Sequence, residues 1–194
     1  MTGIRLAAAA ALAAALVACK KTAPPPMVEA NPPPPHGTTA WKIFNARTAA
    51  PLDISSSATI MDVMVGDTGI TTKLVEGDNG WTCYPDDPST EANDPFCTDE
   101  EGMRWMEAWK AHRPPRLQGM AVAYSMQGGA SASDTDPFKL APDSGKPWIV
   151  DPPSIAIAMP NARSYAGLPT TRRADGPWVR FAGTPYAHIV IPAR

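Results

Sequence analysis

Two stretches in the second half of the chain alternate large and small side chains with the period of two that predicts half-buried β-strands. The first runs from Leu117 to Met126 and the second from Ser154 to Met159. The large side chains on one face are Met120, Val122, Tyr124 and Met126 in the first stretch, and Ile155, Ile157 and Met159 in the second. The small residues on the other face are Gly119, Ala121, Ala123 and Ser125, and then Ser154, Ala156 and Ala158. We therefore expect two strands, each with one bulky face and one small-residue face.

Turn-forming residues separate two further pairs of apolar stretches. The sequence Gly66-Asp67-Thr68-Gly69 lies between residues 57–65 and 70–75. Gly183-Thr184-Pro185 lies between residues 178–182 and 186–191. Glycine- and proline-containing turns between apolar runs are typical of β-hairpins. The pattern predicts two hairpins, one in each half of the chain.

The sequence predicts one helix with a clear beginning and end. Thr98-Asp99-Glu100-Glu101 fits a capping box, in which the Thr98 hydroxyl and the Glu101 carboxylate each accept a backbone N–H. Apolar residues follow at helical spacing, and Pro114-Pro115 ends the helix. We expect the apolar stripe to pack in the core. The alternative is a haem or copper site formed by methionines of this stripe and of the first hairpin: Met61, Met64, Met103 and Met106.

The first 18 residues have the features of a processing segment. Arg5 precedes an alanine- and leucine-rich run from Leu6 to Ala15, which is shorter than the roughly 20 residues of a membrane span. Leu16-Val17-Ala18-Cys19 then resembles the lipobox of bacterial lipoprotein signal peptides. The resemblance implies cleavage before Cys19 and a diacylglycerol on its sulfur. Secretion after cleavage at Ala15 and an uncleaved anchor are the alternatives.

The residues after Cys19 predict a tether to a membrane. Seven of the twelve residues from Pro24 to Pro35 are proline, a density that favours extended polyproline II over a helix or a central strand. About 20 residues at ~3.1 Å each would hold a domain up to ~60 Å from the lipid. We interpret residues 19–40 as lipidated cysteine and tether, and residues 41–194 as the folded domain. Docking of the prolines on a partner is the alternative role.

Lys20 bears on the membrane that the lipid enters. By resemblance to lipoprotein sorting patterns, a residue other than aspartate after the cysteine implies the outer membrane, if the organism has one. We therefore expect a lipid-anchored protein of the cell envelope, facing the periplasm in a Gram-negative organism.

Composition and charge narrow the fold and the partners. Of 194 residues, 23 are proline and 14 are glycine, which disfavours a helical bundle, a coiled coil and a TIM barrel. Residues 53–101 carry twelve acidic side chains and one basic one, whereas residues 102–194 carry eleven basic and six acidic ones. With 17 basic and 19 acidic residues in all, the chain lacks the basic excess typical of nucleic-acid binding. We interpret the acidic half as a solvated face, with pairing to the basic half or a divalent-cation site as alternatives.

Cys83 and Cys97 form an even pair once Cys19 is assigned to lipid. In an exported domain such a pair predicts a disulfide. It would close a proline-rich loop of about 15 residues and stabilise the fold by about 3 kcal/mol in the chain-entropy model. A catalytic or metal-binding thiol pair is the alternative, although the chain has no C-x-x-C motif.

Candidate catalytic chemistry is sparse, and no cofactor is predicted. The chain lacks the G-x-S-x-G, Walker A, G-x-G-x-x-G and H-E-x-x-H motifs. His188 is the histidine best placed for site chemistry, because imidazole can act as a ligand or a base near neutral pH; a structural role is the alternative. We call the segment between Cys83 and Cys97 the acidic loop. The candidates for ligand or metal binding are two carboxylates of this loop, a third carboxylate at Asp136, and two neighbours in the predicted last strand: Asp86, Asp94, Asp136, Tyr186 and His188.

Five short motifs form a recognisable set. They are Asn79-Gly80-Trp81-Thr82-Cys83-Tyr84-Pro85, Asn93-Asp94-Pro95-Phe96-Cys97, Tyr124-Ser125-Met126-Gln127-Gly128, Thr135-Asp136-Pro137-Phe138 and Gly183-Thr184-Pro185-Tyr186-Ala187-His188. Together they resemble a family of exported bacterial proteins of unknown function, over roughly residues 57–192. The resemblance implies one domain across that range and brings no activity or ligand.

These inferences predict a single α+β domain: a mainly antiparallel sheet, one helix and long proline-rich loops, tethered to a membrane by lipid. The expected function is non-catalytic binding of another envelope protein or a small molecule. One alternative is a metal-assisted hydrolase that uses His188 with loop carboxylates. Another is a structural component of the envelope.

Overall fold

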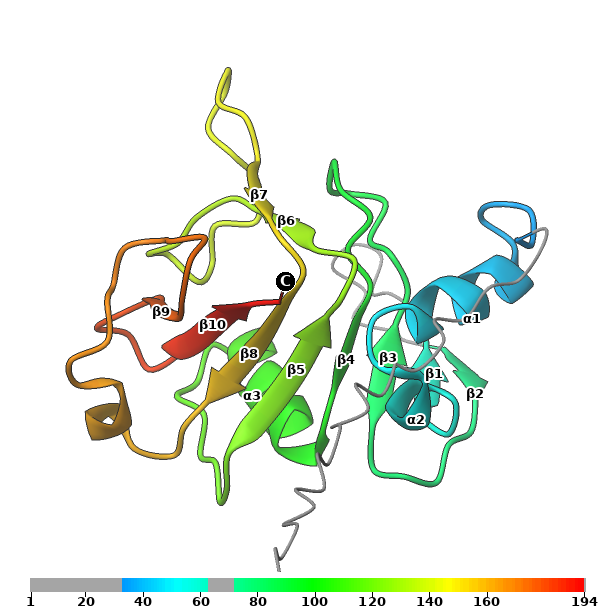
Figure 1. The fold of residues 1–194 in the computed structure, drawn as a ribbon, viewed down its shortest axis with the longest axis horizontal. Coiled ribbons are helices and arrows are strands. Elements are labelled where there is room, and N and C mark those ends of the chain that lie inside the picture. Colours follow the sequence, from blue (N-terminus) through cyan, green and yellow to red (C-terminus); the bar gives the residue numbers. More distant parts are fainter. Residues whose placement is uncertain (1–32, 63–71, 194) are drawn as a thin grey trace, which may run out of the picture.

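An eight-stranded, mainly antiparallel sheet forms the body of the molecule (Figure 1). The structure is a computed structural model that describes residues 33–62 and 72–193. Its main sheet has the strand order β2-β1-β3-β4-β5-β8-β10-β9, in which only β1 and β3 are parallel neighbours. The strands are β1 Thr59–Met61, β2 Lys73–Val75, β3 Thr82–Tyr84, β4 Phe96–Thr98, β5 Ala121–Ser125, β8 Ser154–Ala158, β9 Trp178–Arg180 and β10 His188–Pro192. A second, two-stranded sheet pairs β6 (Gly129–Ser131) with β7 (Ile149–Asp151).

The alternating stretches of the sequence form the strands that they predict. The two stretches with small-residue faces contain β5 and β8, which pair directly with each other. The C-terminal hairpin is β9 and β10, and the N-terminal one is β1 and β2. Residues 63–71, which include parts of both arms of the N-terminal hairpin, lie outside the described residues, as do the predicted signal peptide, Cys19 and most of the tether.

Helices cover opposite faces of the sheet at different places (Figure 1). Helices α1 (Thr39–Arg47) and α2 (Leu52–Ser55) lie over β1 and β3, and helix α3 (Glu100–Lys110) lies behind β4 and β5. A 3₁₀ turn, η2, spans Ala162–Tyr165. The sequence patterns did not predict α1, which begins at Thr39 because the Thr38 hydroxyl accepts the Trp41 N–H at 3.1 Å. The buried cluster beneath α1 and α2 comprises Ala46, Ala49, Ala50, Ala58, Ile60, Cys83 and Cys97.

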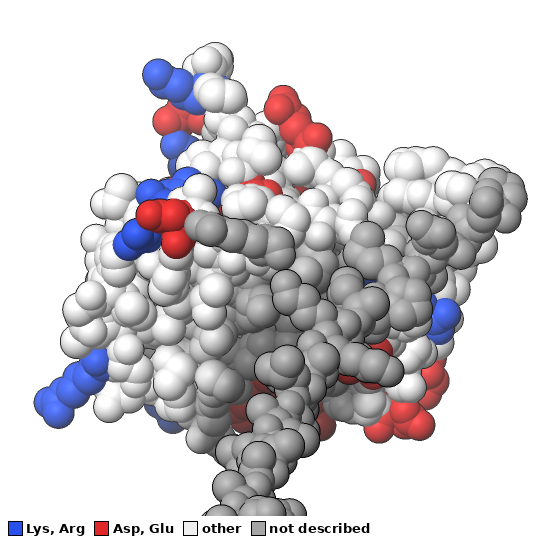
Figure 2. Space-filling view, in the orientation of Figure 1, with Lys and Arg blue, Asp and Glu red and all other residues white. Residues whose placement is uncertain are grey.

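Charged side chains are unevenly spread over the face shown in Figure 2. Acidic side chains gather at the lower right, beside β2, and basic ones lie mainly at the left, on the side of β9 and β10. The acidic and basic halves of the sequence therefore lie toward opposite ends of the sheet.

Helix α3 forms where it was predicted, but its N-cap is Asp99 and not Thr98. The Asp99 Oδ1 atom accepts the Gly102 N–H at 2.8 Å, while Oδ2 accepts the Val122 N–H at 3.1 Å. The Thr98 side chain belongs to β4, where its hydroxyl donates to the Val122 carbonyl at 2.9 Å. The predicted position of the N-cap is therefore wrong by one residue, because strand β4 continues through Thr98 and the Thr98 hydroxyl forms its hydrogen bond within the sheet.

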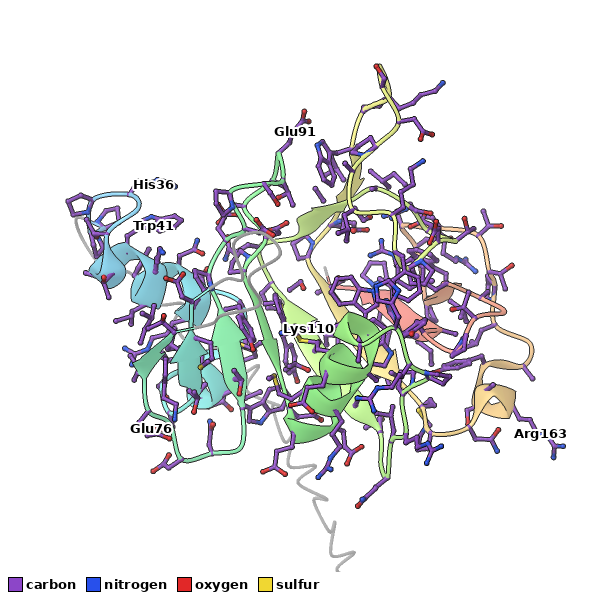
Figure 3. The ribbon with its side chains drawn as sticks, turned by 180° about the vertical axis from the view of Figure 1, so that it is seen from behind. His36, Trp41, Glu76, Glu91, Lys110 and Arg163 are labelled. Carbon is purple, nitrogen blue, oxygen red and sulfur yellow. A yellow bond between two sulfur atoms is a disulfide. The ribbon has the colours of Figure 1, made fainter. Side chains whose placement is uncertain are left out.

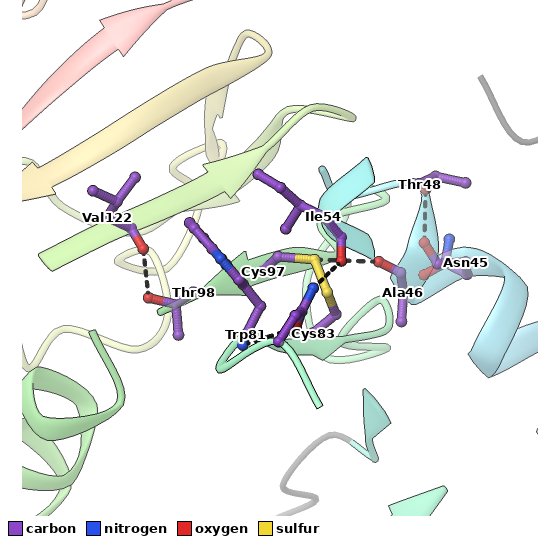
Figure 4. Close-up of a disulfide and its surroundings, with 10 residues drawn as sticks. Asn45, Ala46, Thr48, Ile54, Trp81, Cys83, Cys97, Thr98 and Val122 are labelled. Atoms are coloured by element: carbon purple, nitrogen blue, oxygen red, sulfur yellow. Dashed lines mark hydrogen bonds between the residues drawn. A yellow bond between two sulfur atoms is a disulfide. The ribbon is translucent and has the colours of Figure 1, made fainter. Parts of the chain in front are cut away.

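The predicted disulfide is present and joins two neighbouring strands (Figure 4). Cys83 on β3 lies directly opposite Cys97 on β4, with a Cα–Cα separation of 3.9 Å, and neither residue has measurable solvent exposure. The Sγ atom of Cys97 also lies 3.7 Å from the Ala46 carbonyl of α1. The bond thus closes the acidic loop at its base and lies inside the core beneath α1.

Candidate functional site

A cavity of about 700 Å³ lies between helix α3 and the sheet. Its floor is the small-residue face of β5 and β8, at Ala121, Ala123, Ala156 and Ala158. Because these side chains end at Cβ, they leave space above the sheet that larger residues would fill. The small faces that alternate with bulky ones in the sequence therefore become the floor of a cavity.

Aromatic side chains of α3 form one wall of this cavity. Trp105, Met106 and Trp109 line it, and Lys110 lies in the last turn of the helix beside it (Figure 3). The predicted apolar stripe does face the sheet, yet part of it borders open space. Tyr84 and Phe96, at the two ends of the acidic loop, form the facing wall; their rings stack with centroids 4.8 Å apart.

The segment between β6 and β7 closes the cavity from above, and we call residues 132–148 the roof. Its lining residues are Ala132, Ser133, Pro137, Lys139, Leu140 and Trp148. The roof is fastened to α3, since the Trp109 indole N–H donates to the Pro137 carbonyl at 2.7 Å. The Phe138 ring stacks on His112, with centroids 4.2 Å apart. Leu140 is 70% exposed and lies at the rim of the cavity.

A smaller polar space of about 250 Å³ adjoins the main cavity. Asp94, Asp151, Arg180 and His188 line it, and both Asp94 and His188 also line the main cavity. These four side chains come from the acidic loop, β7, β9 and β10. The main cavity is therefore mainly apolar, and His188 and Asp94 connect it to a charged space at its side; Asp87, Lys110 and Lys139 also line the main cavity.

His188 is held as a neutral ring. Its Nδ1 lies 3.1 Å from the Tyr186 carbonyl oxygen, which can only accept a hydrogen bond, so Nδ1 carries the proton and Nε2 carries the lone pair. Burial lowers the pKa of His188 to about 4, with Arg180, its cross-strand neighbour, contributing in the same direction. Nε2 has no hydrogen-bond partner among the residues that the structure describes.

Aromatic rings enclose the His188 imidazole. The Trp105 and Phe181 rings stand nearly perpendicular to it, with centroids at 5.7 and 5.4 Å. Phe181 has a φ of 54°, in the left-handed region that residues other than glycine rarely adopt. Such conformations cost about 1–3 kcal/mol and recur at functional sites. The Trp105 indole N–H is buried without a hydrogen-bond acceptor in the described part of the chain.

The acidic loop is organised by its own carboxylates. Asp86 Oδ1 accepts the Asp94 N–H at 2.9 Å, and Asp94 accepts the Asp87 N–H at 3.1 Å and the Thr90 hydroxyl at 2.7 Å. Burial raises the pKa of Asp94 to about 6, and the nearby Asp86 carboxylate adds to that increase. Within the described residues, no ion pair joins these loop carboxylates to the basic half. The loop acids mainly hold backbone N–H groups.

Four charged residues at the polar end form a network that sequence reasoning missed. Arg172 donates to Asp134 at 2.9 Å and contacts Asp151, while Arg180 donates to Asp151 at 2.6 Å and to Asp134 at 3.2 Å. Both guanidinium groups also lie over the Trp178 ring, 4.9 and 5.1 Å from its centroid. The network ties both ends of the roof to β9 and to the loop before it.

The five predicted site residues do not form one cluster. His188 and Asp94 line the same space, and Asp86 lies behind Asp94 in the loop. Tyr186 is buried, and its hydroxyl donates to the Arg113 carbonyl at 3.0 Å, so its polar atom serves the fold. Asp136 is exposed in the roof, where it accepts the Phe138 N–H at 2.9 Å.

The described part of the chain holds neither a group of metal ligands nor a membrane-spanning helix. Residues 33–62 and 72–193 contain no group of three or more His, Cys, Asp or Glu side chains placed to hold a metal ion. In the same part of the chain, no helix is long and apolar enough to cross a membrane. The chain matches no protein-family model, no curated protein and no solved structure.

Proposed function

We propose that the mature protein is a lipid-anchored envelope protein that binds a small, mainly apolar molecule in the cavity between α3 and the sheet. The observation that carries this proposal is the cavity itself. Its volume of about 700 Å³ falls within the range of roughly 300–1,000 Å³ common for small-molecule sites. Its lining also has the usual composition of such sites, with aromatic and aliphatic walls and a few convergent polar groups.

The state of the polar groups supports binding over catalysis. Arg180 is held between two carboxylates, and Asp94 accepts hydrogen bonds from its own loop. These contacts fix the shape of the polar end and leave the large apolar surface as the main source of affinity, at about 25 cal/mol per Å² buried.

A fluorescence titration tests the proposal. N-phenyl-1-naphthylamine is an uncharged fluorophore that accepts energy from tryptophan, and Trp105, Trp109 and Trp148 all line the cavity. We expect saturable energy transfer to the probe in the wild-type protein. Ala156→Leu places a larger side chain on the floor and should weaken binding at least tenfold. Ala162→Leu, at an exposed position outside the cavity lining, is the matched control and should bind as the wild type does.

Leu140→Asp provides a second variant in case Ala156→Leu fails to fold. Leu140 is largely exposed at the rim, so a charge there should weaken binding while leaving the free energy of unfolding nearly unchanged. The proposal is overturned if the wild type shows no transfer, or if neither cavity variant changes the affinity.

The anchor is tested separately, on protein extracted from membranes. Leu16-Val17-Ala18-Cys19 supports a mature chain that begins at acylated Cys19. Intact-mass measurement should give the mass of residues 19–194 plus the lipid. A mature N-terminus at any other residue overturns the anchor and leaves the cavity proposal standing.

A further inference from the structure

The structure assigns to this cavity a ligand that carries an uncharged hydrogen-bond donor, a hydroxyl or an N–H, on its apolar body and directs that donor to Nε2 of His188. This inference rests on the proposed function and names the chemical class of the ligand. It is carried by an acceptor without a protein partner among the described residues, placed where a mainly apolar cavity meets the polar space beside it.

The orientation of the imidazole gives Nε2 its role. His188 lines both the main cavity and the polar space, and its Nδ1 is committed to the Tyr186 carbonyl next to the backbone. Nε2 is one of the two ring atoms farthest from Cβ, so it lies on the part of the ring that extends away from the backbone. His188 is partly buried and lines the cavity, so Nε2 is open to a ligand there. A donor on the ligand gives this atom the hydrogen bond that the described residues do not supply.

The surrounding charges select an uncharged donor. Arg180 lies directly across the strand pair from His188, so a cationic group at Nε2 would be repelled. Asp94 and Asp151 line the same space, and they oppose an anion there. A neutral donor meets neither repulsion, and it leaves the ion pairs of Arg180 with Asp134 and Asp151 in place.

The rings around His188 restrict the shape of the ligand next to the donor. The Trp105 and Phe181 rings both stand nearly perpendicular to the imidazole, and Ala156 lines the same space. Flat groups fit between such rings with favourable aromatic contacts. A hydroxyl or N–H attached to a planar body therefore matches the site best.

Two probes with the same ring system separate donation from simple burial. 2-Naphthol donates a hydrogen bond, and 2-methoxynaphthalene cannot. Each is titrated as a competitor of N-phenyl-1-naphthylamine, and the ratio of the two inhibition constants is determined for each protein. A change in the affinity of the fluorophore then cancels in the ratio. In the wild type we expect 2-naphthol to bind roughly fivefold more tightly, the size of one neutral hydrogen bond.

Three substitutions assign that preference to Nε2. His188→Phe keeps a ring between Trp105 and Phe181 and removes the acceptor, so the preference should disappear. His188→Asn retains a donor for the Tyr186 carbonyl but does not reach the position of Nε2, so it should also lose the preference. It provides the test if the phenylalanine variant does not fold. His188→Gln carries a polar atom at the position of Nε2 and should retain part of the preference.

The outcomes distinguish the two proposals. Equal binding of both probes to the wild type overturns the donor assignment and leaves the cavity as a binding site. A preference that persists in His188→Asn and His188→Phe also overturns it, because another group must then accept the hydrogen bond. If neither probe competes and the fluorophore itself does not bind, the proposed function fails as well.

Discussion

At the scale of single residues, Asp99 shows how one side chain can connect two elements. Its carboxylate begins α3 through Gly102 and also accepts a backbone N–H from β5 at Val122. Thr98, one residue earlier, is 2% exposed and serves only the sheet. The capping box in the sequence is compatible with either residue as the cap, because both types cap helices well. The end of strand β4, which the sequence does not mark, decides between them.

We expect Asp99→Ala to lower the free energy of unfolding by about 1–2 kcal/mol, the usual cost of a lost cap. Amide hydrogen exchange gives the specific readout, since the Gly102 N–H loses its acceptor and should exchange faster. Thr98→Val is the comparison: it removes a buried hydroxyl from the sheet and should leave exchange at Gly102 unchanged. Faster exchange at Gly102 in Thr98→Val alone would contradict this assignment of the cap.

At the scale of elements, charge pairs hold the ends of the roof, whereas aromatic contacts hold its middle. Leu140 in the roof and Val150 in β7 are 70% and 73% exposed, but the Phe138 ring stacks on His112. Asp151 instead accepts from Arg180, contacts Arg172 and receives the Ser131 hydroxyl at 3.1 Å. Hydrogen bonds to charged groups contribute about 1.5–3 kcal/mol each. The ionic network therefore holds the ends of the roof, next to β6 and β7, against β9.

Asp151→Asn should lower the free energy of unfolding by about 1–3 kcal/mol, because two guanidinium groups lose a shared anion while the shape is kept. It should also speed tryptic cleavage after Lys139, which lies in the roof and is followed by Leu140. Glu76→Gln is the control, since the Lys73–Glu76 pair is exposed and such pairs contribute about 0–1 kcal/mol. If the two variants unfold at the same denaturant concentration, the network does not fasten the roof.

Features that depend on residues close together in the sequence were predicted, and features that depend on distances between separate elements were missed. Strands β5 and β8 follow from an alternation within ten residues, and the disulfide follows from a pair of cysteines. The cavity does not follow, because the small-residue face of β5 shows only that space could exist. Whether α3 fills that space depends on distances between elements. The network of Asp134 and Asp151 with Arg172 and Arg180 joins isolated residues that no local pattern connects.

At the scale of the whole molecule, two buried groups make stability depend on pH in opposite directions. His188 has its pKa lowered from 6.5 to about 4, so the unfolded chain binds its proton more readily, and stability is lost as pH falls from about 6.5 to 4. Asp94 has its pKa raised from 3.8 to about 6, so the folded chain holds that proton, and stability is lost as pH rises from about 4 to 6. The two effects oppose each other across the same range.

Single substitutions should separate these effects in urea unfolding between pH 4 and 8. Asp94→Asn keeps a group that can donate to Asp86 and removes the titration, so stability should rise more steeply with pH than in the wild type. His188→Asn removes the opposite effect, so stability should fall or stay level as pH rises toward 6. Parallel pH profiles in all three proteins would show that neither group titrates with a shifted pKa.

The small-residue floor of the cavity has a consequence for how the protein can change over evolution. Ala123 and Ala156 line the cavity on one face of β5 and β8, whereas Ile157, next to Ala156 in β8, extends from the opposite face. An alanine codon becomes a valine codon by one nucleotide change, which would reshape the floor without altering the opposite face. On the proposed function, descendants of this chain can therefore acquire new ligand preferences in single mutational steps while the fold is inherited intact.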